Sequence, residues 1–347
     1  MTGYGVNHFG LDKPDRSLNK NALSSDIIRE TSYDLDQIQS QLDSDLCKLT
    51  NDQREASDRI TDAIDRDRGG IFSLDAPGGT GKTFFINPIL AYVRSKQIII
   101  IACASSGIAA TLLAGSRTAH STFKLPLDIN RKDEPTCNIT RSQSAGRLLM
   151  QCKAIVWDEC TMAHKKSREA LERILRDLRG NNRVMGGLVL ILAGDFRQTL
   201  PVIPRSTPVD ELNACLKSSF LWPQVETLKL STNMRIAKCN QIGAEQFAET
   251  LLSLGNGTFP RFSLPDYITL TPDSCQILET REQLSERVFP DIRNNIREKT
   301  WLSKRVILAP RNDMVNDINL SIQSSFGGLS MTHRSADTNV NVEDSVA

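Results

Sequence analysis

Residues 76–83 of the chain read APGGTGKT, and this stretch decides the fold class. It follows a short apolar run at 71–74 and opens a segment with helical character. Glycines let backbone N–H groups converge on phosphate oxygens, and the N-terminal end of the next helix adds positive potential. The spacing fits a P-loop in which Ala76 replaces the usual first glycine. A Gly-rich turn without a ligand is the alternative, but the predicted strand and helix on either side favour phosphate binding.

The loop assigns a role to two of its side chains. In a P-loop the lysine reaches the β- and γ-phosphates, and the hydroxyl that follows ligates Mg²⁺. Lys82 and Thr83 occupy these two positions. Pro88 falls inside the helix that should follow, and it is predicted to kink that helix. The nucleotide-binding residues expected from the loop are Gly78, Gly79, Thr80, Gly81, Lys82 and Thr83.

Apolar strands alternate with helical segments along this part of the chain. A helical segment at 165–179, for example, lies between two of the strands. Strands that alternate with helices imply a parallel sheet covered on both faces, which is the α/β class and, with the loop, a P-loop NTPase. The predicted strands are 71–74, 98–104, 154–157, 188–193 and 225–230.

Composition excludes several classes of protein. Hydrophobic residues make up 39% and charged residues 24% of the 347 residues, which is typical of a globular protein rather than a disordered chain. Lys and Arg (42) balance Asp and Glu (41), so no global charge points to nucleic acid, although a local basic groove stays open. The eight cysteines form no C-x-x-C pair and the four histidines are scattered, so we expect reduced thiols inside the cell rather than zinc or disulfides.

One uncharged run, 97–116, approaches the length of a membrane span. Its four consecutive isoleucines favour a buried strand instead, and the Ser-Ser-Gly at 105–107 breaks the run before an Ala/Leu-rich helical segment. The first thirty residues contain no apolar core of a secretory signal. No membrane partner is therefore expected.

A pair of carboxylates ends the predicted strand at 154–157. Asp158 and Glu159 follow this strand directly, at the carboxyl end where open α/β sheets place their ligands. In a P-loop enzyme the first acid holds Mg²⁺ and the second polarises the attacking water. The acids could instead cap the helix that follows, because acidic residues favour helix N-termini. Together with the P-loop upstream, the pair favours nucleotide hydrolysis.

A third polar cluster, GDFRQ at 194–198, follows the predicted strand at 188–193. It again brings polar side chains to the carboxyl end of a strand. Gln198 could sense the γ-phosphate and report its loss to a nucleic-acid groove. The alternative is a polar loop whose side chains bond to its own backbone.

In combination these motifs resemble the petite-integration-frequency family of superfamily-one DNA helicases, especially the forms in eukaryotic genomes and in Helitron transposons. The resemblance covers most of 30–320 and implies a RecA-like fold. An ordered set of motifs is more specific than any one of them. The landmarks in order are LTNDQR, APGGTGKT, ASSGIAATLL, GSRTAHSTFKLP, WDEC, GDFRQTLPVI, LSTNMR and ILAPRNDMVNDIN.

The resemblance implies a role for each catalytic residue. Lys82 would bind the phosphates, and Asp158 would hold the metal together with Thr83. Glu159 would activate water, and Gln198 would couple the γ-phosphate to DNA.

Two further residues take their roles from the resemblance. Gln53 would recognise adenine, and Arg235 would stabilise the transferring phosphoryl charge, for which an arginine is chemically apt. Both have alternatives. Thr50 and Gln53 also fit a capping box, in which Gln53 would bond the backbone of Thr50. Arg235 could be a solvated charge at a helix end.

Two segments that begin after strand ends, 104–110 and 118–123, are expected to contact single-stranded DNA. Small residues and hydroxyls there permit close approach of phosphates, and His120 and Phe123 could contact sugars or bases. Core packing is the alternative for Phe123, and a hydrogen-bonded loop position for His120. Because aromatic residues make up only 5% of the chain, we expect contacts mainly to the DNA backbone. The expected DNA-binding residues are Ser105, Ser106, Gly107, Thr118, His120 and Phe123.

The patterns divide the chain into four parts. They are a polar lead-in at 1–48 with weak helical character at 33–46, a RecA-like ATPase lobe at 49–236, linker helices with an incomplete second RecA-like lobe at 237–330, and a polar tail at 331–347. By resemblance, a wedge that separates DNA strands is inserted at 124–147.

The second lobe is predicted from little sequence. A helix at 242–254 is followed by a strand at 305–309 and a helix after Pro310, which would open a second sheet. The resemblance leads us to expect a glycine-rich V-A-L-S-R motif, whose arginine completes the ATP site, and the chain does not contain it. We therefore expect a C-terminally truncated chain, whether a fragment of a longer gene, a mis-predicted gene model or a degenerate transposon copy.

The resemblance predicts an ATP-dependent 5′-to-3′ DNA helicase in which Mg²⁺-ATP hydrolysis drives movement along single-stranded DNA and duplex unwinding. The expected partners are ATP and single-stranded and forked DNA, and the expected state is a monomer. Repair, recombination and telomere maintenance are the implied roles, with the nucleus as compartment and the mitochondrion as alternative. A truncated or transposon-derived remnant that binds ATP and single-stranded DNA without unwinding is a second reading. An unrelated P-loop ATPase is a third.

Overall fold

The computed structural model describes residues 22–237, 243–260, 268, 270, 275–324 and 326. The chain forms two compact units, one that runs to Thr258 and one from Phe259 to Val346. The first unit carries the sheet and every site residue predicted above.

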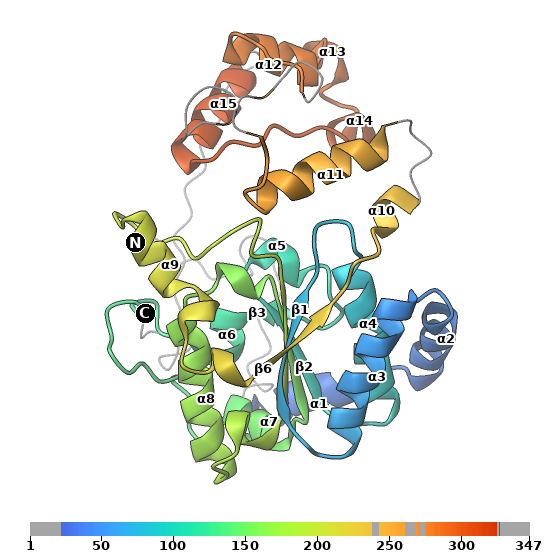
Figure 1. Ribbon diagram of the computed structural model, residues 1–347, viewed down its shortest axis with the longest axis vertical. Coiled ribbons are helices and arrows are strands. Elements are labelled where there is room, and N and C mark those ends of the chain that lie inside the picture. Colours follow the sequence, from blue (N-terminus) through green and yellow to red (C-terminus); the bar gives the residue numbers. More distant parts are fainter. Residues whose placement is uncertain are drawn as a thin grey trace, which may run out of the picture. The chain divides into compact units, whose positions relative to one another are not determined.

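Six parallel strands form one sheet in the first unit (Figure 1). The strands are β1 (Gly70–Asp75), β2 (Ile100–Ala104), β3 (Arg117–Thr118), β4 (Ala154–Asp158), β5 (Val189–Gly194) and β6 (Val225–Lys229). Their order across the sheet is β3-β2-β4-β5-β1-β6. Because the strands are parallel, all their carboxyl ends lie at one edge of the sheet.

Helices connect the strands and cover both faces of the sheet. They are α1 (Ala22–Thr31), α2 (Leu35–Leu46), α3 (Asn51–Asp65), α4 (Lys82–Ser95), α5 (Gly107–Ala110), α6 (Ala119–Phe123), α7 (Ser144–Gln151), α8 (Lys165–Arg179), α9 (Pro208–Ala214), α10 (Met234–Ala237) and α11 (Ala244–Gly255). Short 3₁₀ turns lie at Cys160–Met162, Val184–Gly187, Leu216–Ser218 and Trp222–Gln224.

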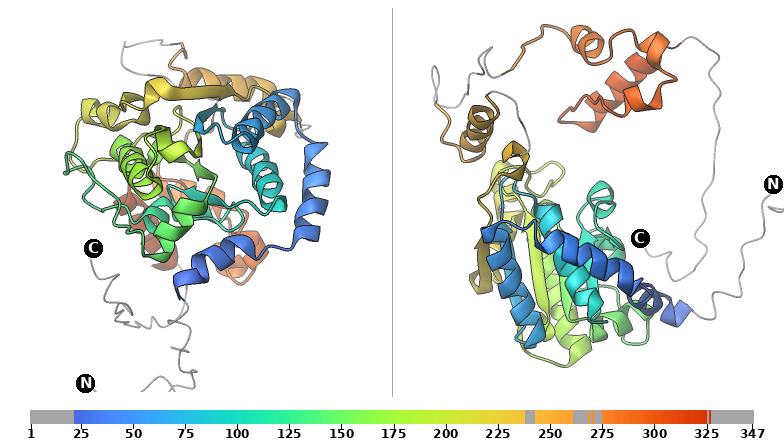
Figure 2. Two further views of the ribbon diagram at one scale, coloured as in Figure 1. Left: turned by 90° about the horizontal axis from the view of Figure 1, so that it is seen from below. Right: turned by 90° about the vertical axis from the view of Figure 1, so that its right-hand side faces the viewer.

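Each face of the sheet has its own hydrophobic core. Successive strand residues point to opposite faces. Ile155 and Leu190 therefore join one core, and Val156 and Ile191 join the other. Helices α3 and α4 cover one face, and α6, α7 and α8 cover the other (Figure 1). Figure 2 shows the same layers from two further directions.

The structure confirms the predicted α/β architecture. Four predicted strands, 71–74, 154–157, 188–193 and 225–230, correspond to β1, β4, β5 and β6, and the strand at 98–104 is β2. Helix α8 has the bounds predicted for it. The two residues of β3 were not predicted, because so short a strand has no detectable alternation. Helix α4 runs from Lys82 to Ser95 with Pro88 buried inside it.

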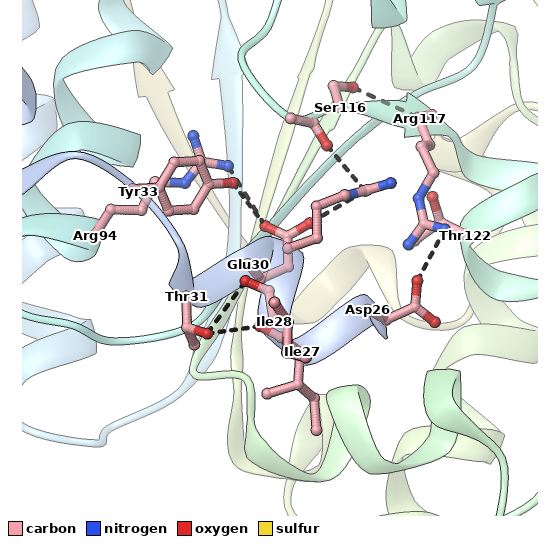
Figure 3. Close-up of polar contacts among 12 residues, drawn as sticks. Asp26, Ile27, Ile28, Glu30, Thr31, Tyr33, Arg94, Ser116, Arg117 and Thr122 are labelled. Carbon is pink, nitrogen blue, oxygen red and sulfur yellow. Dashed lines mark hydrogen bonds and ion pairs between the residues drawn. The ribbon is translucent and has the colours of Figure 1, made fainter. Parts of the chain in front are cut away.

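Three of the described helices precede the first strand, and two of them, α1 and α2, lie in the predicted lead-in. The weak helical stretch predicted at 33–46 is α2, whereas α1 was not predicted. Helix α1 is held by the buried carboxylate of Glu30, which accepts from Tyr33 Oη at 3.0 Å and lies 3.7 Å from Arg94 Nη2 (Figure 3). The Arg94 guanidinium lies 4.3 Å from the centre of the Tyr33 ring. Burial, with the nearby charge of Glu30, raises the pKa of Tyr33 to about 12 against the opposing effect of Arg94.

The described part of the second unit is helical. It contains α12 (Arg281–Val288), α13 (Ile292–Asn295), α14 (Lys299–Leu302) and α15 (Asn312–Ser324), and α15 is the helix predicted after Pro310. The strand predicted at 305–309 is wrong, since this segment joins no ladder and leaves Val306 70% and Leu308 87% exposed. An isolated strand has no partner for its backbone groups, so an apolar run alone does not make one.

The predicted wedge segment, 124–147, forms no strand and packs partly on the core. Leu125, Ile129, Cys137 and Ile139 are buried there, and α7 begins within its last residues. Its role as a wedge stays a prediction.

Three expected absences can be compared with the part of the chain that the structure describes. Seven cysteines there are free thiols. No group of three His, Cys, Asp or Glu side chains in that part is arranged to hold a metal. Among the same residues, no helix has the length and apolar character needed to cross a membrane.

Candidate active site

Strand order brings three predicted motifs to one place. Strands β4, β5 and β1 are neighbours, and their register sets Trp157 opposite Leu192 and Asp75 opposite Gly194. The phosphate loop follows β1, the acidic pair ends β4, and the polar cluster follows β5. All three therefore meet at the carboxyl edge of the sheet, where open α/β folds bind ligands.

The phosphate loop joins β1 to α4 in the way the sequence predicts. Gly79 and Gly81 have φ values of 93° and 75°, which favour glycine. Thr80 Oγ1 donates to the Pro77 carbonyl at 2.8 Å, and Lys82 Nζ donates to the Ala76 carbonyl at 2.8 Å. The lysine thus lies across the loop, and the loop backbone caps the first turn of α4 where an anion is favoured.

The two acids differ in their surroundings. Asp158 is 3% exposed, and its Oδ1 accepts from the Glu159 backbone N–H at 2.9 Å. Burial and the neighbouring Glu159 raise the pKa of Asp158, while that hydrogen bond and Lys82 oppose the rise. Glu159 is half-buried, has a φ of 48°, and makes no side-chain capping bond. The capping alternative is therefore not what the structure shows for Glu159. Its left-handed backbone is typical of functional positions.

Thr83 and Asp158 fit a magnesium ion that arrives with a nucleotide. A hydroxyl and a carboxylate are the hard oxygen ligands that Mg²⁺ prefers, and phosphate oxygens and water supply the rest. The raised pKa of Asp158 means that its buried charge is poorly compensated by the protein, and a cation would supply that compensation. These two side chains would hold the metal between the loop and β4.

Gln198 lies over the phosphate loop. Its Nε2 donates to Asp195 Oδ2 at 3.0 Å and lies 3.4 Å from where a Cβ on Gly78 would be. Its side chain is exposed toward solvent. The amide is therefore anchored within its own loop and also has exposed surface beside the phosphate loop, and its role as a γ-phosphate sensor stays a prediction.

Gln53 forms the capping box that was its alternative. Its Oε1 accepts from the Thr50 N–H at 3.1 Å, and its Nε2 donates to the Thr80 carbonyl at 3.0 Å. Gln53 is 1% exposed, and its Nε2 also lies 3.2 Å from Met234 Sδ. Both ends of the amide are occupied by protein, so a contact with adenine would require Gln53 to exchange one of these bonds.

The backbone of Arg235 lies at the rim of the phosphate loop. Its backbone N–H donates to the Gly79 carbonyl at 3.3 Å, and its side chain is exposed. The structure thus places the backbone of this residue at the phosphate loop, and the charge-stabilising role of its guanidinium stays a prediction.

Two residues that support this site were not predicted. Asn233 Oδ1 accepts from the Arg235 N–H at 3.0 Å and packs against Gly79, where an added Cβ would come within 2.5 Å of it. Asp52 accepts from the Ser231 N–H at 2.7 Å, and hydrogen bonds hold its pKa well below the usual range despite partial burial. Asn233 directly precedes α10 and Asp52 lies in the first turn of α3, and these positions at helix starts were the available signal.

The predicted DNA-binding residues divide into three groups. Ser105, Ser106 and Thr118 make side-chain hydrogen bonds, Gly107 and His120 are exposed, and Phe123 is buried. Ser105 Oγ accepts from Trp157 Nε1 at 2.9 Å, and Ser106 caps α5 through the Ala109 N–H at 3.2 Å. Thr118 caps α6, while Gly107 and His120 are exposed. Because β2 neighbours β4, the Ser105 backbone N–H donates to the Asp158 carbonyl at 3.1 Å, which joins this surface to the acidic pair.

The prediction for Phe123 is wrong. Its side chain is 0% exposed, and its ring lies 5.6 Å from the Trp157 ring, so no base can reach it. The core alternative holds because α6 turns this aromatic residue onto the sheet, where burial of a large apolar side chain is favourable.

The fold and this site together define a P-loop NTPase of the RecA-like kind. The sequence model of PIF1-like helicases matches residues 48–263, more than half of the chain, so the chain belongs to that family. The family match begins after α1 and α2.

Individual relatives agree with this assignment. The chain is 30% identical over 148 residues to an ATP-dependent DNA helicase Pif1 of a Psychrobacter strain, which covers 43% of this chain and 22% of that protein. It is 28% identical over 206 residues to PIF1 of Candida albicans, which covers 57% and 22%. The chain thus spans about a fifth of the length of these curated relatives.

A solved structure shows the same fold. A Bacteroides Pif1 helicase, crystallised with ADP-AlF3 and single-stranded DNA, superposes with a TM-score of 0.55 at 20% identity. The superposition covers 78% of this chain and 57% of that one.

Proposed function

We propose that the chain is an ATP-dependent DNA helicase component that hydrolyses Mg²⁺-ATP in response to single-stranded DNA. The observation that carries the proposal is the meeting of the phosphate loop, the acidic pair and Gln198 at one sheet edge. Three independent motifs needed for phosphoryl transfer converge there. Membership of the PIF1-like helicase family supports the same assignment.

The residues of the edge divide the chemistry among them. Lys82 and the loop N–H groups would bind the phosphates, and Thr83 and Asp158 would hold Mg²⁺, whose positive charge would offset that of the γ-phosphate. Glu159, half-buried beside the metal ligand, orients a water and accepts its proton. The Arg235 guanidinium would reach the phosphoryl oxygens from the rim of the loop, where the Arg235 backbone N–H donates to the Gly79 carbonyl.

The DNA surface lies beside this site. The exposed side of α5 and α6, with Gly107, Thr118 and His120, offers small and polar groups to a phosphate backbone. The bond from the Ser105 N–H to the Asp158 carbonyl links that surface to β4, and Gln198, four residues after the end of β5, lies beside the phosphate loop. Loss of the γ-phosphate would therefore change the position of groups on the DNA surface through the adjacent ends of β2, β4 and β5.

The finer assignments rest on the family. We propose 5′-to-3′ movement, action on forked DNA as a monomer, and roles in repair, recombination and telomere maintenance. A DNA substrate implies residence in the nucleus, or alternatively in the mitochondrion, and localisation of a tagged chain would test this.

ATP turnover with and without single-stranded DNA tests the proposal. We expect DNA to stimulate turnover, and Lys82→Ala to lower it by on the order of 10²-fold or more. Glu159→Gln should lose turnover but still bind ATP. The control is Lys96→Ala, because Lys96 follows α4 at the end opposite the loop and pairs with Asp65. Equal turnover in wild type and Lys82→Ala would overturn the proposal.

Strand displacement separates this function from the second candidate, an ATP- and DNA-binding chain that does not unwind. That candidate is favoured by the absence of any strand or buried residue in the described part of 259–326. Duplexes with 5′ tails, 3′ tails and forks should be tested. DNA-stimulated turnover without displacement would support the second candidate, and turnover that ignores DNA would support an unrelated P-loop ATPase.

A further inference from the structure

One side chain outside the predicted site joins two of its strand ends. Arg197 Nη1 donates to Asp75 Oδ1 at 3.0 Å and to Asp195 Oδ1 at 3.3 Å. Asp75 ends β1, just before the phosphate loop, and lies opposite Gly194 in the register of β1 and β5. The next residue of β5's connection is Asp195, so the fold itself places two carboxylates side by side and Arg197 between them.

Asp195 in turn holds Gln198. It is 3% exposed, and its two oxygens have different partners. Oδ1 accepts from the Arg197 backbone N–H at 3.1 Å and from its guanidinium, whereas Oδ2 accepts from Gln198 Nε2 at 3.0 Å. The position of the Gln198 amide over Gly78 therefore depends on a carboxylate whose other oxygen is fixed by Arg197.

Arg197 also compensates negative charge where phosphates must bind. Two adjacent carboxylates repel each other and any phosphate near them, and a guanidinium between them cancels this repulsion. Partial burial opposes the charge of Arg197, yet its bonds to Asp75 and Asp195 raise its pKa. Its Nε donates to Asn256 Oδ1 at 2.7 Å, and Gly255 packs so closely that an added Cβ would lie 2.9 Å from Arg197 Cβ.

We propose that Arg197 is a positioning residue that, through Asp195, holds the Gln198 amide in place over the phosphate loop. This inference rests on the proposed role of Gln198 as the γ-phosphate sensor. In this proposal Arg197 acts on Asp195 and not on the nucleotide itself. Its bond to Asp75 at the end of β1 and its bond to Asn256 at the end of α11 hold the guanidinium in place, and the guanidinium fixes the orientation of Asp195.

Nucleotide discrimination tests the proposal better than activity. The measurement is the Kd of Mg²⁺-ADP and of a non-hydrolysable Mg²⁺-ATP analogue on the full chain. If Arg197 acts through Gln198, Arg197→Ala should weaken the ATP analogue by on the order of tenfold and leave ADP within about twofold. A purely structural role would weaken both ligands alike.

A double-variant cycle gives the second readout. Gln198→Ala should lose the same discrimination, and Arg197→Ala combined with Gln198→Ala should be no worse than Gln198→Ala, because both changes remove one interaction. Arg197→Lys should fall between wild type and Arg197→Ala, since one ammonium can bridge the two carboxylates but cannot also make the bond from Nε to Asn256. If Arg197→Ala unfolds, the double variant with Asp75→Asn and Arg197→Gln, which keeps the net charge, replaces it in the same two Kd measurements.

The matched control is Arg59→Ala. Arg59 pairs with Glu226 at 2.6 Å across α3 and β6, away from the carboxyl edge, and its loss should change neither Kd. Equal loss of ADP and ATP-analogue binding in Arg197→Ala, or additive losses in the double variant, would overturn the inference. A Gln198→Ala chain that discriminates normally would instead overturn the sensor role in the proposed function.

Discussion

Asp158 and Glu159 are neighbours in sequence, yet the fold gives their carboxylates different chemistry. Asp158 ends a fully buried strand, and its pKa is raised by burial. Glu159 turns into the left-handed region and stays half-exposed, where it can meet water. Asp158 therefore carries a buried charge that a bound cation would compensate, and Glu159 keeps the solvent access that proton transfer requires.

We expect Asp158→Asn to stabilise the chain while it abolishes Mg²⁺-ATP turnover. At neutral pH the folded protein holds Asp158 ionised at a cost, because burial raises its pKa above that of the unfolded chain. Asparagine keeps the acceptor for the Glu159 N–H and removes the charge. A gain of roughly 1 kcal/mol should raise the melting temperature by about 2 to 4 °C in metal-free buffer.

The pH dependence gives this prediction a sign. The advantage of Asp158→Asn should be complete above the raised pKa of Asp158 in the native state. It should shrink as pH falls toward 3.8, the ordinary pKa of an aspartate, because the wild-type carboxyl then takes up a proton in the folded protein. Thermal melts across this range would show it, and an asparagine variant less stable than wild type at pH 7 would contradict it.

Phe123 and His120 lie three residues apart and should respond differently to alanine. Phe123→Ala removes a fully buried ring from the core and should cost about 3 to 4 kcal/mol of unfolding free energy. His120→Ala should leave stability within about 0.5 kcal/mol and weaken binding to single-stranded DNA. Urea unfolding and DNA titration separate the two. Reduced DNA affinity of folded Phe123→Ala, with stability unchanged, would contradict the assignment.

At the scale of elements, α1 contacts β3, the strand at one edge of the sheet. Figure 3 shows Glu30 between two groups, with Tyr33 and Arg94 on one side and Asp26 and Arg117 on the other. Asp26 pairs with Arg117 of β3 at 3.2 Å, and Glu30 faces Arg94 of α4. A helix outside the family match thus ties the edge strand near the DNA surface to the helix that begins at the phosphate loop.

The buried Glu30 and Arg94 should be strongly coupled. Arg94→Met removes the buried counter-charge of Glu30, which is 4% exposed, and leaves only the more exposed Arg29 at 3.2 Å, so we expect a loss of about 3 kcal/mol. Adding Glu30→Gln should recover roughly 1 kcal/mol or more. Urea unfolding of the four chains measures the coupling. Arg66→Met is the control, because Arg66 pairs with Asp62 at a site where its side chain is 75% exposed and should change little.

At the scale of the whole molecule, the two units differ in how much they bury. Both hydrophobic cores lie in the first unit, around the sheet. In the described part of the second unit no residue is buried, and α12 to α15 expose apolar side chains such as Leu320. Free energy from apolar burial is therefore concentrated in the first unit, where it positions the active site.

Hydrogen exchange should reveal this difference. Amides of α15 should exchange on the order of 10³-fold faster than those of α8, although the two helices have similar lengths. Helix α8 opens only with the core, whereas α15 frays by itself. Mass spectrometry of peptides from both helices provides the comparison. Equal protection of α15 and α8 would mean that the second unit has a cooperative core.

The sequence alone determined the local chemistry of this protein. The phosphate loop, the acids at 158–159 and four of the buried strands depend on contacts within a few residues, so pattern and spacing suffice to find them. The same local rules offered, as the alternative to adenine recognition, the capping box that Gln53 forms.

Only the tertiary structure decided which of these features meet. The order β4-β5-β1 gathers the acids, Gln198 and the loop, and it creates the bridge from Asp75 through Arg197 to Asp195. Burial of Phe123 and the unpaired segment at 305–309 likewise follow from neighbours far away in the chain. Pairing and burial are set by long-range contacts, and no local pattern encodes which strands become neighbours.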